Sequence, residues 1–213
     1  MRVCVIGTGY IGLVTSAALA QLGHQVIYIN ENATEIEQIQ LKKLLINEPE
    51  LEEALHLEKG VGRLEFSSNL NVGVANSQII FIAVDSFLLN TTKDDTSHID
   101  RIEAIAKKIG VSISGEYKVI VNKSIPYFGI GNWIREIIDE EINKRKLEFT
   151  PEFDVIDSSG LLENNLIFNN INNAIFFTLE SNNQRVNTTL KQLGYASTNY
   201  TEPTTPFPYQ NQN

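Results

Sequence analysis

The 213-residue sequence has a single cysteine, one tryptophan and one methionine. With Cys4 alone, no disulfide can form within the chain, which excludes a small secreted fold held together by disulfides. No apolar run approaches the roughly 18 residues that a membrane-spanning helix needs. The apolar N-terminus has no basic leader, so we interpret it as a core strand rather than a signal peptide. We therefore expect a cytoplasmic protein.

Basic residues are also scarce, with 17 Lys and Arg against 26 Asp and Glu, a net charge of −9 and a pI near 4.9. This balance argues against nucleic acid as a partner, because phosphate backbones are bound by clustered Lys and Arg. Cys4 lies within an apolar run and is expected to be a buried apolar residue rather than a nucleophile. His56 and His98 have no cysteine or carboxylate at metal-ligand spacing, so we predict no metal site.

The strongest pattern that is present lies in the first thirty residues. An apolar run leads into Gly7, Gly9 and Gly12 at Gly-x-Gly-x-x-Gly spacing, then into an apolar helix pattern, and a second apolar run follows at 26–29. This order predicts the strand, glycine turn, helix and strand of a dinucleotide-binding unit. Gly7 permits a sharp turn, Gly9 leaves room for a pyrophosphate, and Gly12 allows the helix to pack closely on the strand.

The helix after the turn is predicted over Leu13 to Leu22, and its free N–H groups and dipole would hold the phosphates. Tyr10 and Ile11, which lie between the glycines, are predicted to contact the cofactor with them. His24 falls in the turn before the second strand and is expected to be a turn residue. A nucleotide-free α/β domain that kept its turn glycines is the alternative.

The end of the second strand departs from the dinucleotide pattern. Such domains place a carboxylate there for the adenosine ribose, and here the residue is Asn30. A neutral contact in place of a charge-assisted one costs roughly 1–2 kcal/mol, about tenfold in affinity. Glu31 could replace the carboxylate, although neighbouring residues on a strand point to opposite faces. Because Glu31 would repel a 2′-phosphate and no arginine stands here, we expect NAD, bound weakly, rather than NADP.

Further elements follow in alternation, which predicts an α/β fold with a doubly wound, mainly parallel sheet and helices on both faces. We predict one Rossmann-type domain over 1–195 and a polar, Pro-containing tail over 196–213. The expected helices cover 33–45, 48–57, 69–75, 99–109, 131–146 and 183–193. The expected strands after the second cover 64–66, 78–84, 117–121, 153–156 and 174–179.

Two of these strand ends are expected to contact a ligand, because open α/β sheets bind ligands at the carboxyl ends of their strands. The run over 78–84 ends in Val84 and Asp85, and the run over 117–121 is followed by Lys123 and Ser124. Lys123 either faces the cleft or is an ordinary surface lysine.

Several separated motifs together resemble the UDP-glucose/GDP-mannose 6-dehydrogenase family over roughly residues 1–195. The residues that carry the resemblance are Val3 to Val14, Leu22-Gly23-His24, Glu48-Pro49-x-Leu51, Phe81-Ile82-Ala83-Val84 and Lys123-Ser124. The resemblance implies the N-terminal NAD-binding domain of an enzyme that oxidises the C6 alcohol of a nucleotide sugar to a carboxylate with two NAD.

The same resemblance implies a catalytic cysteine, lysine and glutamate that this chain lacks. The cysteine and lysine come from regions beyond the N-terminal domain, and Gly160 stands where the family places its glutamate. Glu163 is weighed as a substitute base and is expected to be a solvated helix residue. The family's Gly-Thr-Pro reads Asp85-Ser86-Phe87 here, and its Lys-Ser-Thr ends in Ile125. We therefore assign no catalytic residue.

Three functions remain open. The first, which we favour, is a binding or regulatory module without dehydrogenase activity of its own, acting through a protein partner. The second is one chain of a split nucleotide-sugar dehydrogenase whose missing residues come from another chain. The third is an interaction domain that binds no nucleotide. The oligomeric state is not predicted.

Overall fold

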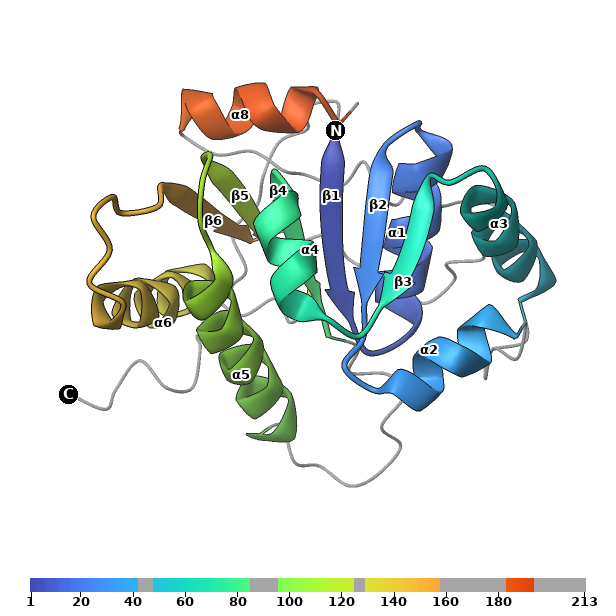
Figure 1. The fold of residues 1–213 in the computed structure, drawn as a ribbon, viewed down its shortest axis with the longest axis horizontal. Coiled ribbons are helices and arrows are strands. Elements are labelled where there is room, and N and C mark those ends of the chain that lie inside the picture. Colours follow the sequence, from blue (N-terminus) through green and yellow to red (C-terminus); the bar gives the residue numbers. More distant parts are fainter. Residues whose placement is uncertain (42–47, 85–95, 125–128, 158–182, 194–213) are drawn as a thin grey trace.

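A computed structural model of the chain describes residues 1–41, 48–84, 96–124, 129–157 and 183–193. Its six strands form one parallel sheet in the order β3-β2-β1-β4-β5-β6 (Figure 1). The strands are β1 (Arg2–Gly7), β2 (Gln25–Ile29), β3 (Leu64–Ser67), β4 (Ile79–Ala83), β5 (Lys118–Asn122) and β6 (Phe153–Asp157). This order confirms the predicted doubly wound fold, with the direction of winding reversing between β1 and β4.

Helices cover both faces of the sheet. They are α1 (Tyr10–Gln21), α2 (Ala33–Gln40), α3 (Pro49–Gly60), α4 (Leu70–Asn76), α5 (Thr96–Ser112), α6 (Ile130–Lys144) and α8 (Gln184–Lys191). The apolar residues of α1, α2, α3 and α8 share one core with one face of the sheet. Those of α4, α5 and α6 form a second core on the opposite face.

The strands are apolar on both sides because both faces are covered. In β1, the side chains of Val3 and Val5 pack in the core that contains α1, here called the α1 core. Those of Cys4 and Ile6 pack in the core that contains α5, here called the α5 core. Cys4 is fully buried, and burial raises the pKa of its thiol above the ordinary range. The prediction that Cys4 is a buried apolar residue is therefore confirmed.

Most element boundaries agree with the predictions to within three residues. The helix predicted from Ile99 begins at Thr96 and continues to Ser112. The helix predicted over 33–45 is described to Gln40, and Leu41 caps its C-terminus. The predicted strand over 174–179 and the tail over 196–213 lie outside the described residues, so the division at residue 195 stays a prediction.

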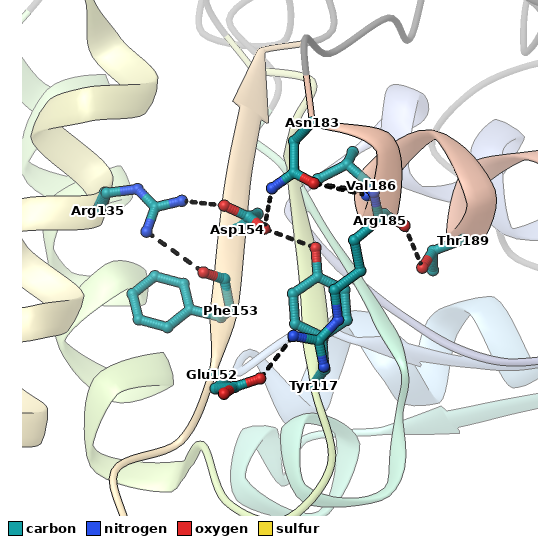
Figure 2. Close-up of polar contacts among 9 residues, drawn as sticks. All are labelled: Tyr117, Arg135, Glu152, Phe153, Asp154, Asn183, Arg185, Val186 and Thr189. Carbon is teal, nitrogen blue, oxygen red and sulfur yellow. Dashed lines mark hydrogen bonds and ion pairs between the residues drawn. The ribbon is translucent and has the colours of Figure 1, made fainter.

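The last described helix, α8, is fastened to the N-terminal end of the sheet by Asp154 of β6 (Figure 2). One carboxylate oxygen accepts hydrogen bonds from the Tyr117 hydroxyl at 2.7 Å and from the Asn183 side-chain amide at 2.9 Å. The other oxygen accepts from the Arg135 guanidinium at 2.7 Å. Since Asn183 caps the N-terminus of α8, a single carboxylate connects β5, β6, α6 and α8.

Further contacts lie at the two ends of α8, one made by Arg185 at its start and one by Leu193 just after its end. The Arg185 guanidinium lies 3.7 Å from the centre of the Tyr117 ring and is paired with Glu152 at 2.6 Å (Figure 2). His24 is buried between the N-terminal ammonium group of Met1 and the carbonyl oxygen of Leu193, 3.2 Å from each. Burial, and then the nearby ammonium, lower the pKa of His24, whereas the Leu193 carbonyl opposes the shift. The residue is therefore more than a turn residue.

None of the described helices combines the length and the apolar character needed to cross a membrane.

Candidate functional site

The glycine turn after β1 is a close joint between β1, α1 and β2. A Cβ atom built on Gly12 would lie 3.0 Å from the Cα of Gly7 and 3.0 Å from a ring carbon of Tyr28. A Cβ atom on Gly7 would lie 3.2 Å from both the Ala83 carbonyl oxygen and the Tyr28 ring. These approaches give Gly12 the packing role expected of it, and they give Gly7 one as well.

Tyr28 also belongs to this joint, and its role was not predicted from the sequence. The side chain is fully buried, and its hydroxyl donates a hydrogen bond to the Gly7 carbonyl oxygen at 3.2 Å. The available signal was an aromatic residue among the aliphatic residues of the second strand, one residue before its end. Tyr28 thus fixes the Gly7 carbonyl at the start of the turn.

The N-terminus of α1 has Gly9 as its N-cap, and no side chain caps the helix. The Tyr10 hydroxyl donates to the Glu48 carboxylate at 2.9 Å, which links the first turn of α1 to the start of α3. Ile11 is buried in the core. In a dinucleotide-binding domain, the turn glycine and the first turn of this helix are the part that contacts the pyrophosphate.

Asn30 follows β2 at the same edge of the sheet and is buried. Its side-chain oxygen accepts from the Asn32 backbone N–H at 2.9 Å, and its side-chain nitrogen donates to the Glu35 carboxylate at 2.7 Å. The second Glu35 oxygen accepts from the Asn32 side chain at 2.8 Å. Glu35 was not predicted, although Asn32-x-x-Glu35 has the spacing of a helix-capping pair.

Glu31 is directed to the other face of the sheet. Its carboxylate is paired with the ammonium group of Lys108 on α5. Helix α5 packs on the face opposite to α1, as the alternation of side chains along a strand requires. Of the two carboxylates that follow β2, Glu35 is therefore the one beside Asn30.

The ends of β4 and β5 are joined by Ser124. Its hydroxyl accepts from the Val84 backbone N–H at 2.9 Å and donates to the Ile82 carbonyl oxygen at 3.1 Å. A ligand could therefore only donate a hydrogen bond to this hydroxyl. The structure places Val84 and Ser124 together at the predicted edge, and Asp85, Ile125, Gly160 and Glu163 lie outside the described residues.

Asp157, which ends β6, stabilises the start of α6. Its carboxylate accepts from the Asn122 side chain at 2.9 Å and from the Gly131 backbone N–H at 3.1 Å. Burial raises the pKa of this carboxyl above its ordinary value, and the two hydrogen bonds oppose the shift. Asp157 is thus a helix cap at the candidate site.

Lys123 lies between these strand ends and is only partly exposed. Burial lowers the pKa of its ammonium group to about 8. Among the described residues, no acceptor for this ammonium group is found, and whether Lys123 faces a ligand stays a prediction. The Nδ1 atom of His98 is likewise buried without a hydrogen-bond partner. Within the described ranges, no three His, Cys, Asp or Glu residues lie close enough together to hold a metal ion.

Comparison with known proteins agrees with this geometry. Residues 1–192 match the NAD binding domain of the UDP-glucose/GDP-mannose dehydrogenase family. A UDP-glucose 6-dehydrogenase of Pseudomonas aeruginosa is 31% identical over an aligned length of 159 residues that covers 72% of this chain and 34% of that protein. UDP-glucose 6-dehydrogenase YwqF of Bacillus subtilis is 33% identical over 142 residues, 67% of this chain and 31% of that protein. The chain spans about a third of the length of these curated relatives.

Solved structures show the same fold. A UDP-glucose dehydrogenase from the archaeon Pyrobaculum islandicum is similar with a TM-score of 0.74 and 25% identity, over 90% of this chain and 43% of that one. A GDP-mannose dehydrogenase from Pseudomonas aeruginosa has a TM-score of 0.74 at 23% identity, over 91% of this chain and 44% of that one. The chain belongs to the UDP-glucose/GDP-mannose dehydrogenase family and contains its NAD-binding domain.

Proposed function

We propose that this chain binds NAD at the C-terminal edge of its sheet and acts as a binding or regulatory module that does not oxidise a nucleotide sugar by itself. The observation that carries the NAD half is the joint of Gly7, Gly12 and Tyr28, which holds the backbone in the form of a phosphate-binding turn. The residues proposed to contact the cofactor directly are Gly7, Gly9, Tyr10, Ile11, Gly12, Val84, Asp85 and Ser124.

The absence of activity is argued from the sequence of the segment itself. Cys4 is its only cysteine, and it is buried in the α5 core, where it cannot attack an aldehyde. Gly160 stands where a carboxylate is expected. Without a thiolate and a base, the 213 residues can hold the cofactor but cannot complete alcohol oxidation to a carboxylate. A cytoplasmic protein partner would then use the NAD-bound form.

Calorimetric titration of the 213-residue chain with NAD tests the binding half. We expect saturable binding in the micromolar to millimolar range and weaker binding of NADP. Gly9→Val is the matched variant, because a branched side chain at this position would occupy the space of the pyrophosphate. Binding by the wild type and none by Gly9→Val supports the proposal. No binding of NAD by a folded wild type at millimolar concentration rejects it.

A second candidate is a working oxidoreductase that takes its cysteine and lysine from another chain. It is favoured by the two hydrogen bonds of the Ser124 hydroxyl, to the Val84 backbone N–H and the Ile82 carbonyl oxygen, which hold the ends of β4 and β5 together. An assay of NADH absorbance with UDP-glucose and with GDP-mannose distinguishes the two candidates. The module predicts no turnover by the purified chain and none after its native companions are added, whereas the split enzyme predicts turnover only with a companion.

A further inference from the structure

Both polar atoms of the Asn30 side-chain amide are hydrogen-bonded within the protein. The Asn32 backbone N–H requires an acceptor and the Glu35 carboxylate requires a donor, so the two partners together fix which amide atom faces which. The residue is also only 4% exposed. At the position where a dinucleotide-binding domain usually presents its ribose acceptor, this chain therefore has a side chain that is already used as a support.

The carboxylate that Asn30 supports is that of Glu35. One oxygen accepts from Asn30 at 2.7 Å, and the other accepts from the Asn32 side chain at 2.8 Å. A carboxylate oxygen has two lone pairs, so each oxygen keeps one acceptor position after these bonds. Two fixed oxygens, each with one lone pair left, are suited to the two neighbouring hydroxyls of a ribose.

Helix capping does not account for this arrangement. A glutamate at the third helical position usually accepts from the backbone N–H of the N-cap residue. Here that N–H, from Asn32, is bonded to Asn30, while the Asn32 side chain caps α2 by accepting from Thr34 and Glu35. Glu35 is therefore held by side chains around the strand end and is not required as the cap.

We propose that Glu35, positioned by Asn30 and Asn32, accepts the hydroxyls of the adenosine ribose and selects NAD over NADP. This inference rests on the proposed binding of NAD. The carboxylate that accepts the ribose hydroxyls then belongs to the first turn of α2 and not to the end of β2. A negative charge is therefore still present beside the strand end. A 2′-phosphate would meet the carboxylate of Glu35, which explains discrimination without any residue of the strand itself.

NAD titrations of three variants test the proposed role of Glu35. Glu35→Gln should weaken NAD binding about tenfold and narrow the difference between NAD and NADP, because a neutral acceptor replaces a charged one. Glu37→Gln, on the exposed side of the same helix, is the control and should bind as the wild type does. Asn30→Asp should also weaken binding, because it places a second carboxylate against Glu35. Tighter binding by Asn30→Asp would return the role to the strand end and overturn the inference.

An analogue separates contact with the ribose from a change in the fold. The NAD analogue that lacks the adenosine 2′-hydroxyl should bind the wild type about fivefold to tenfold more weakly than NAD, whereas the loss should be clearly smaller for Glu35→Gln, which keeps only a neutral acceptor. An equal loss in the two proteins would overturn the inference and leave NAD binding intact. If the folded wild type binds neither ligand, the proposed function itself fails.

Discussion

Two lysines mark the opposite ends of β5 and show how differently the two ends of the sheet are built. Lys118, the first residue of the strand, is buried, and its ammonium group donates to the carbonyl oxygens of Ser77 at 2.6 Å and Ala75 at 3.3 Å. Burial lowers the pKa of both ammonium groups, but for Lys123, just past the strand, no acceptor is found among the described residues. The ammonium group of Lys118 thus has acceptors within the fold, whereas for Lys123 the described part of the chain provides none.

The same contrast extends across the sheet. At the N-terminal end, Asp154 accepts hydrogen bonds from three donors (Figure 2). His24 there joins Met1 to Leu193, just past the end of α8. At the C-terminal end, α1 starts at Gly9 without a side-chain cap, and the carboxylate of Glu35 retains acceptor positions. We infer that the N-terminal end serves stability and the C-terminal end serves binding.

The largest effect on stability is expected at Gly12, where the C-terminal end of the sheet also contains a close packing contact between β1, α1 and β2. Gly12→Ala forces a Cβ atom to 3.0 Å from both Gly7 and Tyr28, and should cost about 3 kcal/mol of unfolding free energy. Urea denaturation measures this. Gly60→Ala is the control, since a Cβ atom there meets nothing within 4 Å, and it should be neutral or slightly stabilising. Equal stability of the two variants would refute the close joint.

Asp154→Ala tests the N-terminal end. It leaves Tyr117, Arg135 and Asn183 without their shared acceptor and should cost about 1.5 kcal/mol, since the site is partly exposed. Backbone amides of α8 should exchange with deuterium faster, while NAD affinity stays unchanged. Glu152→Ala, which removes an exposed ion pair, should cost less than about 0.5 kcal/mol. A loss of NAD binding in Asp154→Ala would show that the two ends are coupled.

The fold could be predicted from the sequence because its signals are local. Apolar runs covered on both faces, glycine spacing and a proline at the start of α3 each determine an element with its neighbours in the chain. The departures lie at helix ends, where the last turns depend on packing: the helix predicted from Ile99 starts three residues earlier.

The candidate site was only partly predictable, because its decisive contacts join residues through side-chain geometry. Glycine spacing indicated the turn but not Tyr28, which reaches Gly7 from another strand. The end of β2 indicated a missing carboxylate, yet the amide orientation that presents Glu35 depends on three side chains at once. The sequence alone likewise could not predict that Lys123 is only partly exposed.

The smallest effects should distinguish the two lysines directly, because the same substitution has opposite signs at the two ends. Lys118→Met leaves two carbonyl oxygens without their donor and should cost about 1 kcal/mol of stability at pH 7. Lys123→Met removes a poorly solvated charge and should add about 1 kcal/mol. Urea denaturation measures both, and loss of stability in both variants would refute the contrast between the ends.

The pH dependence of stability separates removal of charge at Lys123 from a gain in apolar packing. Its pKa is about 8 in the fold and near 10.5 in the unfolded chain, so between these values the unfolded state binds more protons. Wild-type stability from this group therefore rises from about pH 8 upward, and the advantage of Lys123→Met should shrink over the same range. Lys118 and Tyr117 titrate in both proteins and cancel in the difference. An advantage that stays constant from pH 7 to pH 10 would mean that the ammonium group is well solvated or paired, and that the C-terminal end holds no uncompensated charge at this position.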